Sequence, residues 1–549
     1  MLRTNTLPLK HLPARTGIRI ILLIGVGLRL FHFLYNRSLW MDEVYLTSGM
    51  LHMGYWDLAT KVMDYEQKAP IGFLWMVRLF LDMGGNSEVV LRTVPFLSGL
   101  ASLLLFARMT GYFLKPYGQL LAVAIFALAP AVIYHTVEIK QYATECLATV
   151  IALYLFARYK DCKDWQSRLL WAAYGALLIW FSNAVIFVLA GIAISMTVQD
   201  ILQKDGKTVL RNAVPFTVWL ISFCGNYYLF THEQAASGWL VKWFAVYGYF
   251  LPFPPHNVQE LLWLPKSLIL MMDYPLGLVW NYRPVAAHSV WKIILLPVIP
   301  LLTLCCGLGF SYRADRRIFY SLLLPILLML LASALHLYPL LERFWLFTAP
   351  ILLIFISFGF EYFQRSCRSG WTLLLFCALL AGPVIQSVYF IVHPHRFYKH
   401  KKSYEREALT YIDQHLQQGD AVYNYWNNSP GYSVYKRMYR YKYQAFQGKD
   451  YRLQSGNLDA YNSHLKAEFT MFYGKKRIWV VVNRQFATTI GDEIDFPDWY
   501  YKNGTSPEQN LLQQLGKIGR QVKVITYPDI AVYLFLTNNK NDQMNVTTP

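Results

Sequence analysis

The stretch from Trp371 to Ile391 reads WTLLLFCALLAGPVIQSVYFI and contains no charged side chain. About 20 predominantly apolar residues in an α-helix cross the hydrocarbon core of a bilayer. Similar stretches lie at residues 17–35, 88–107, 118–135, 143–158, 208–230, 287–309, 318–338 and 343–363. Residues 169–199 are too long for one span, and Ser182-Asn183 in their middle predicts a tight connection between two short ones. The sequence therefore predicts a polytopic α-helical membrane protein with about eleven transmembrane helices.

The composition agrees with lipid as the main solvent. Hydrophobic residues make up 55% of the chain and charged residues only 15%, against about a quarter in soluble domains. The net charge of +18 resides mostly in loops between apolar stretches, and no basic run interleaved with aromatic residues indicates nucleic acid. Seven cysteines, with none after Cys377 and no Cys-x-x-Cys pair, argue against a disulfide scaffold and a metal site.

Basic residues in alternate loops predict the orientation. Loops rich in Lys and Arg tend to stay cytoplasmic. The basic loops are Arg108/Lys115, Arg158/Lys160/Lys163/Arg168, Lys204/Lys207/Arg211, Arg313/Arg316/Arg317 and Arg365/Arg368, together with the N-terminus. They fall on one side, so we expect a cytoplasmic N-terminus and, after an odd number of spans, a C-terminal region on the outer face.

The chain divides into a membrane domain and a soluble domain. We expect a transmembrane domain over residues 1–395, with long outer loops at 36–87 and 231–286, and an interfacial helix at 70–83. A small α/β domain is expected over 396–537 and a disordered tail over 538–549. Within the α/β domain, the pattern predicts a helix at 403–418 and strands at 421–425, 477–483, 522–526 and 530–536.

Two adjacent carboxylates, Asp42 and Glu43, follow the first span in the sequence Leu39-Trp40-Met41-Asp42-Glu43. One interpretation is that Asp42 caps a helix over residues 43–54, its side chain accepting from free backbone N–H groups. The other is a general base, because a partly desolvated carboxylate can accept a proton from an attacking hydroxyl.

Cations from separate outer loops accompany this pair. Lys68 lies two residues before Pro70, which is expected to begin the interfacial helix. The Lys68 ammonium would then lie beside a helix N-terminus, and the two together make an anion site. Lys140 lies in Glu138-Ile139-Lys140-Gln141-Tyr142, where Glu138, Tyr142 and Glu145 would share one helix face with Lys140 turned away. Arg343 opens the tenth span. The alternatives are snorkelling for Lys68, a self-neutralising loop around Lys140 and membrane anchoring for Arg343.

These motifs resemble the C-type (GT-C) superfamily of membrane glycosyltransferases, near the family 39 protein mannosyltransferases and their bacterial relatives. The resemblance covers roughly residues 15–395 and rests most specifically on the Asp42-Glu43 pair. It implies inverting transfer of a sugar from a polyprenyl-phosphate donor to an acceptor hydroxyl of a lipid, glycan or protein on the outer face of the bacterial inner membrane. It also implies that Asp42 is the base and that Glu43 assists it or orients the acceptor. Lys68, Lys140 and Arg343 would hold the phosphate, and Glu138 and Tyr142 would also belong to the substrate-binding site.

The chain departs from its relatives at the lysine motif. In the lipid A aminoarabinose transferases an acidic residue precedes the lysine and two prolines follow it, whereas here Gln67 precedes it and Ala69-Pro70 follow. This argues against a divalent metal at that position, and no cofactor is assigned. A transporter or flippase for lipid-linked sugars, a polymerase or ligase with a diphosphate donor, and a non-catalytic scaffold remain as alternatives.

Overall fold

The computed structural model describes residues 14–231, 238–279, 290–397, 403–484, 497–501 and 506–537. The chain forms two compact units. The first comprises Met1–Asn36, Met53–Gly85 and Val89–Phe397, and the second comprises Arg37–His52, Asn86–Glu88 and Tyr398–Pro549. Short pieces of the first outer loop therefore fold with the C-terminal region. The predicted tail, residues 538–549, lies outside the described residues.

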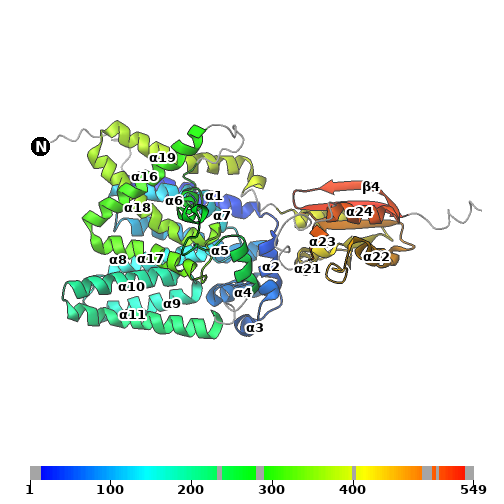
Figure 1. Ribbon diagram of the computed structural model, residues 1–549, viewed down its shortest axis with the longest axis horizontal. Coiled ribbons are helices and arrows are strands. Elements are labelled where there is room, and N and C mark those ends of the chain that lie inside the picture. The colour runs from blue at the N-terminus through cyan, green and yellow to red at the C-terminus, as the bar shows by residue number, and fades with distance from the viewer. Residues whose placement is uncertain are drawn as a thin grey trace, which may run out of the picture. The chain divides into compact units, whose positions relative to one another are not determined.

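The first unit is a bundle of helices (Figure 1). Its long helices are α1 (Ala14–Tyr35), α5 (Glu88–Thr110), α6 (Pro116–Leu128), α8 (Tyr142–Tyr159), α9 (Trp165–Phe181), α10 (Val185–Leu202), α11 (Gly206–Asn226), α16 (Val290–Ala314), α17 (Arg316–Ala334), α18 (Ala349–Ser366) and α19 (Ser369–Val392). Shorter ones are α3 (Tyr55–Thr60), α4 (Ile71–Gly84), α7 (Pro130–His135), α13 (Gly238–Val246), α14 (Val258–Leu261) and α15 (Trp263–Asp273). Single turns are η2 (Asp64–Glu66), η3 (Tyr227–Thr231), η4 (Glu342–Thr348) and η5 (Pro394–Arg396).

Every predicted span contains a helix, although the count of eleven is not confirmed. Within the described residues, eight helical segments are long and apolar enough to cross a membrane. Three predicted spans are not among these eight. Residues 118–135 correspond to α6 with α7, residues 143–158 to α8, and the first half of 169–199 to α9. These helices are not both long and apolar enough to meet the same standard. The protein is a multi-pass membrane protein by the composition of these helices.

The predicted break at Ser182-Asn183 is present, and the reason is local hydrogen bonding. Helix α9 ends at Phe181 and α10 begins at Val185, whose N–H donates to the Ser182 hydroxyl at 3.0 Å. Glu145 of α8 accepts hydrogen bonds from the backbone N–H groups of Asn183 and Ala184. Helices α9, α10 and α11 then run side by side (Figure 1).

Buried Arg29 of α1 compensates for a second break, between α6 and α7. Pro130 has no N–H, so the carbonyl of Phe126 loses its partner four residues later. The Arg29 guanidinium donates to that carbonyl at 3.2 Å and to the Ala127 carbonyl at 3.1 Å. Both terminal nitrogens of this charged side chain, which is fully buried within the apolar bundle, thus have backbone oxygens as partners.

Two glycines allow α16 and α18 to pack backbone against backbone. A Cβ on Gly307 would lie 1.8 Å from the Phe355 carbonyl oxygen, and a Cβ on Gly359 would lie 1.9 Å from that of Thr303. Small residues at such crossings are the usual basis of helix association in lipid, where no hydrophobic drive holds helices together.

The second unit contains a five-stranded mixed sheet in the order β2-β1-β3-β5-β4. Its strands are β1 (Ala421–Asn424), β2 (Phe446–Gln447), β3 (Arg477–Asn483), β4 (Gly519–Thr526) and β5 (Ile530–Thr537). β1 is parallel to β2 and β3, whereas β5 is antiparallel to β3 and β4. The helices are α2 (Met41–Met50), α20 (Glu405–His415), α21 (Ser429–Met438), α22 (Leu458–Glu468), α23 (Asp498–Tyr501) and α24 (Pro507–Gly516), with turns η6 (Trp426–Asn428) and η7 (Phe469–Phe472). The predicted small α/β domain is confirmed.

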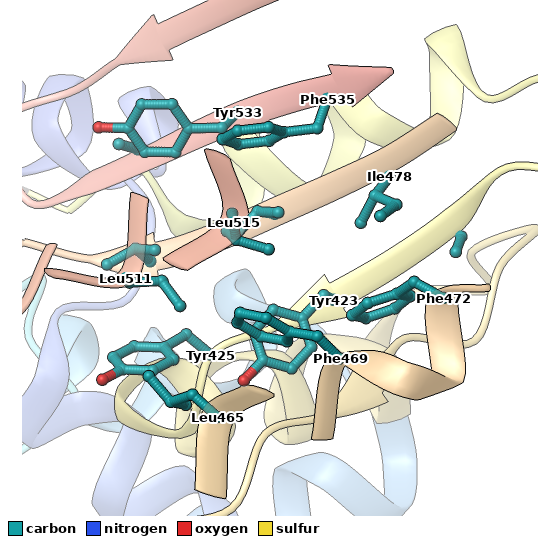
Figure 2. Packing of buried hydrophobic residues seen from close by; sticks show 14 of the residues in the cluster. Tyr423, Tyr425, Leu465, Phe469, Phe472, Ile478, Leu511, Leu515, Tyr533 and Phe535 are labelled. Atoms are coloured by element: carbon teal, nitrogen blue, oxygen red, sulfur yellow. The ribbon is translucent and has the colours of Figure 1, made fainter. Parts of the chain in front are cut away.

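Side-chain alternation along β3 divides the core of this domain between two faces. Ile478, Val480 and Val482 face α22, η7 and α24, where Leu465, Phe469, Phe472, Leu511 and Leu515 cover the sheet (Figure 2). Trp479 points to the opposite face, where its ring lies 6.2 Å from that of Tyr411 in α20. Such burial on both faces explains why β3 reads as a continuous apolar run.

Candidate active site

The predicted carboxylate pair lies at the start of α2, but the two carboxylates have different roles. Trp40 is the N-cap residue, and the Glu43 carboxylate accepts from the Trp40 backbone N–H at 3.2 Å and pairs with Arg37 at 3.4 Å. Glu43 is fully buried, whereas Asp42, one position earlier, is partly exposed. The interpretation of Asp42 as the cap of a helix over 43–54 is therefore wrong, because Glu43 performs that capping and the helix begins at Met41. Asp42 sits in the first turn, where the helix dipole favours a carboxylate.

A contact between two distant loops brings the predicted lysines into one region of the first unit. Lys140 Nζ donates to Gln67 Oε1 at 2.6 Å, which joins segments 73 residues apart. Lys140 is only 6% exposed. Lys68, the neighbour of Gln67, is half-buried, and its burial lowers the pKa of the ammonium while Glu66 opposes that shift. Pro70 caps α4, which begins at Ile71, one residue later than predicted.

Glu138 does not share a face of α8 with Tyr142 and Glu145, because α8 begins only at Tyr142. Glu138 instead lies in the turn after α7, where its Oε2 is 2.5 Å from His135 Nδ1. The other ring nitrogen of His135 contacts the hydroxyl of Tyr274. A carboxylate that accepts from Nδ1–H leaves Nε2 to accept from the tyrosine hydroxyl, so the histidine links the two groups.

Arg343 and Tyr142 extend this cluster. The Arg343 guanidinium lies 6.0 Å from the ring centroid of Tyr142 and 5.9 Å from that of Phe344, within the range of a cation–π contact. The Tyr142 ring lies 5.0 Å from the ring of His135. Arg343 is the second residue of η4, which continues directly into α18, as expected for the start of the tenth span.

The first unit thus brings together Glu138, Lys140, Tyr142 and Arg343, with Lys68 next to the Gln67 that contacts Lys140. Asp42 and Glu43 belong to the second unit. Gln67, His135 and Tyr274 belong to this cluster and were not among the predicted site residues. His135 could have been found from its spacing of three residues to Glu138, but Tyr274 lies in another loop and carries no such signal.

The donor set of the described residues does not fit a metal ion. No group of three or more His, Cys, Asp or Glu side chains among them is arranged to hold one. Gln67 offers a neutral oxygen and already accepts from Lys140, and Glu138 is bound to His135. Lys68, Lys140 and Arg343 supply groups that can bind an anion, and the carboxylates of Glu66, Glu138 and Glu342 lie near them.

The fold is similar to those of two solved glycosyltransferases. ArnT from Cupriavidus metallidurans bound to undecaprenyl phosphate superposes with a TM-score of 0.54 at 13% identity, over 94% of this chain and 98% of its own. Its apo state gives a TM-score of 0.53 at 12% identity, over 95% of this chain and 98% of its own. The oligosaccharyltransferase of Archaeoglobus fulgidus, in complex with zinc and sulfate, gives 0.53 at 14% identity, over 96% of this chain and 73% of its own.

No protein-family model and no curated protein sequence matches the chain. The likeness therefore rests on structure, and it extends over both the helical unit and the C-terminal domain. The chain has the C-type (GT-C) glycosyltransferase fold.

Proposed function

We propose that the protein is a membrane glycosyltransferase that moves a sugar from a polyprenyl-phosphate donor to an acceptor hydroxyl on the outer face of the bacterial inner membrane. The acceptor is a lipid, a glycan or a protein. In this orientation the N-terminus is cytoplasmic and the C-terminal domain extracytoplasmic, in agreement with the basic residues of alternate loops.

Inverting transfer requires a base for the acceptor and cations for the leaving group. The acceptor oxygen attacks the anomeric carbon, its proton passes to the Asp42 carboxylate, and the bond from that carbon to the phosphate oxygen breaks. The electron pair stays on the polyprenyl phosphate. Lys68, Lys140 and Arg343 stabilise that phosphate as its charge develops, and electrostatic stabilisation of this kind is usually the largest part of catalysis. Glu43, held by Arg37 and the Trp40 N–H, keeps the first turn of α2 in place for Asp42.

The contact between Lys140 and Gln67 is the observation that carries the proposal. It joins the two lysine-bearing loops into one cationic region, next to the cation–π contact of Arg343 with Tyr142. Cations grouped in this way are complementary to the phosphate of a polyprenyl-phosphate donor, because ammonium and guanidinium groups form charge-assisted hydrogen bonds with phosphate oxygens. Support also comes from ArnT, which has a similar fold and was solved with undecaprenyl phosphate bound.

The test of the base is Asp42→Asn in the full-length protein, purified in detergent and supplied with a panel of polyprenyl-phosphate sugars. Asp57→Asn is the matched control, because Asp57 lies in the same outer loop and pairs on the surface with Lys61 at 2.6 Å. We expect a loss of about a hundredfold or more in kcat for Asp42→Asn, the size of a general-base contribution, and little change for the control. Full activity of Asp42→Asn would remove Asp42 from the mechanism.

The phosphate site is tested with Lys140→Gln against Lys61→Gln. We expect about a hundredfold loss of kcat in the first variant and none in the second. The donor panel also separates the alternatives. Transfer only from diphosphate-linked donors would favour a polymerase or ligase, and movement of labelled donor across proteoliposome membranes without transfer would favour a flippase.

A further inference from the structure

Helix α2, which carries Asp42 and Glu43, folds with the C-terminal domain. Residues 37–52 and 86–88 belong to the same compact unit as the chain from Tyr398, and α2 packs along α21. The two parts are separated by about 350 residues of sequence. The contacts between them show how the domain holds this segment.

The hydroxyl of Tyr435 in α21 holds the residues just before α2. It accepts from the Leu39 backbone N–H at 2.7 Å and lies 3.0 Å from Ser38 Oγ. Ser38 Oγ also accepts from the Arg406 backbone N–H at 2.9 Å. Tyr435 is fully buried, so its hydroxyl depends on these protein partners rather than on water. One hydroxyl thus anchors the chain three residues before Asp42.

A second anchor lies at Glu88, which is the first residue of α5 and belongs to the same compact unit as α2. The Glu88 carboxylate is 3.0 Å from the Arg406 guanidinium and accepts from the Tyr439 hydroxyl at 2.7 Å. Its side chain is only 1% exposed. A carboxylate buried to this extent needs such partners, so the contact is specific in its geometry. At the far end of α2, Arg437 Nη1 lies 3.3 Å from His52 Nδ1, so both ends of the helix meet the domain.

We propose that the C-terminal domain positions the catalytic helix α2, and that Tyr435 is its principal positioning residue, with Ser38 and Arg406 as partners. The inference rests on the proposed function, because it gives the domain a part in the reaction of Asp42. A base acts only within hydrogen-bond reach of the proton that it accepts. A displacement of about 1 Å can reduce the rate by about a hundredfold, so a helix at the start of a loop needs an external support.

The test compares Tyr435→Phe with Tyr533→Phe in the full-length protein. Tyr435→Phe removes one hydroxyl and keeps the ring. Tyr533→Phe removes a comparable hydroxyl in the same domain, one that lies on β5 and donates to Glu508 of α24 at 2.5 Å. Ser38→Ala serves as a second variant that removes the other partner of the same hydrogen bond. Hydrogen exchange of residues 39–50 and the kcat and KM for the donor are measured for each.

We expect Tyr435→Phe and Ser38→Ala to exchange faster over residues 39–50 and to lose about tenfold or more in kcat, while the KM for the donor stays within about twofold. Tyr533→Phe should match wild type in both measurements. Unchanged protection of α2 in Tyr435→Phe overturns the inference, and so does lost protection with an unchanged kcat. If the wild type transfers no sugar, the proposed function has failed, and hydrogen exchange still decides whether the domain holds α2.

Discussion

Raising the pH from 6 to 8 should destabilise the C-terminal domain, because the carboxyl group of Glu405 is buried and its burial favours the protonated form. Glu405 begins α20, and its Oε1 accepts from Asn428 Nδ2 at 2.9 Å. A Cβ on Gly431 would lie 2.7 Å from the Glu405 carboxyl carbon, so the backbone of α21 closes over the group. Burial raises the pKa of this carboxyl to about 8 from its ordinary 4.5, and the negative charges of Asp529 and Glu407 add to the effect.

The sign follows from which state holds the proton. Between pH 4.5 and about 8 the unfolded chain has lost the Glu405 proton and the folded domain still holds it. Folding then takes up a proton, so stability falls as the pH rises. At about 1.36 kcal/mol per pH unit, the loss between pH 6 and 8 is at most about 3 kcal/mol. Burial also raises the pKa of Asp529, to about 6, so its own contribution falls mainly below this window.

Hydrogen exchange of the β3 and β5 amides in the full-length protein measures this loss, after correction for the intrinsic pH dependence of exchange. Glu405→Gln should abolish most of the slope between pH 6 and 8. Asp459→Asn, at an exposed position in the first turn of α22, should keep it. A flat profile in the wild type, or an unchanged slope in Glu405→Gln, would refute the reasoning.

Three further predictions concern packing and buried hydrogen bonds. Gly359→Leu should prevent α16 and α18 from packing together, because even a Cβ at this position would lie 1.9 Å from the Thr303 carbonyl oxygen. The yield of monodisperse protein in detergent should therefore fall steeply. Gly309→Leu, at an open position, should not lower that yield. Ile478→Ala, at a fully buried position in β3, should destabilise the C-terminal domain by about 2–5 kcal/mol and Ile478→Val by about 1 kcal/mol, measured by the same amide exchange. Tyr274→Phe removes the hydroxyl that contacts His135 Nε2 and should lower the free energy of unfolding by about 1–3 kcal/mol, measured as a lower Tm of the helical unit. An unchanged Tm would mean that water replaces the hydroxyl.

The membrane helices could be predicted from sequence because they depend on local composition. Every predicted span contains a helix, and the Ser182-Asn183 break was located correctly. The strands at 421–425, 477–483 and 530–536 were found because each is a short apolar run between turn residues. The two-residue strand β2 and helices α21, α22 and α24 were not predicted.

The site residues were predicted from their charge and from the loop in which each lies. These two properties do not indicate which residues each of them contacts. Glu43 caps α2 because of its spacing from Trp40, which a closer reading of the local sequence could have found. Gln67 lies 73 residues from Lys140, and Tyr274 lies 139 residues from His135. Spacing along the chain carries no information about such pairs.

It follows from the sequence alone that the chain resides in a membrane, that its apolar stretches form helices, and that an α/β domain comes after them. These properties depend on transfer of side chains from water to lipid and on backbone hydrogen bonding within each helix, both of which are local. Three contacts depend on the tertiary structure: Lys140 meets Gln67, Arg29 donates to the Phe126 carbonyl freed by Pro130, and Tyr435 holds the chain before Asp42. Each of these contacts forms because buried polar groups must find partners, and the fold alone determines which partners are within reach.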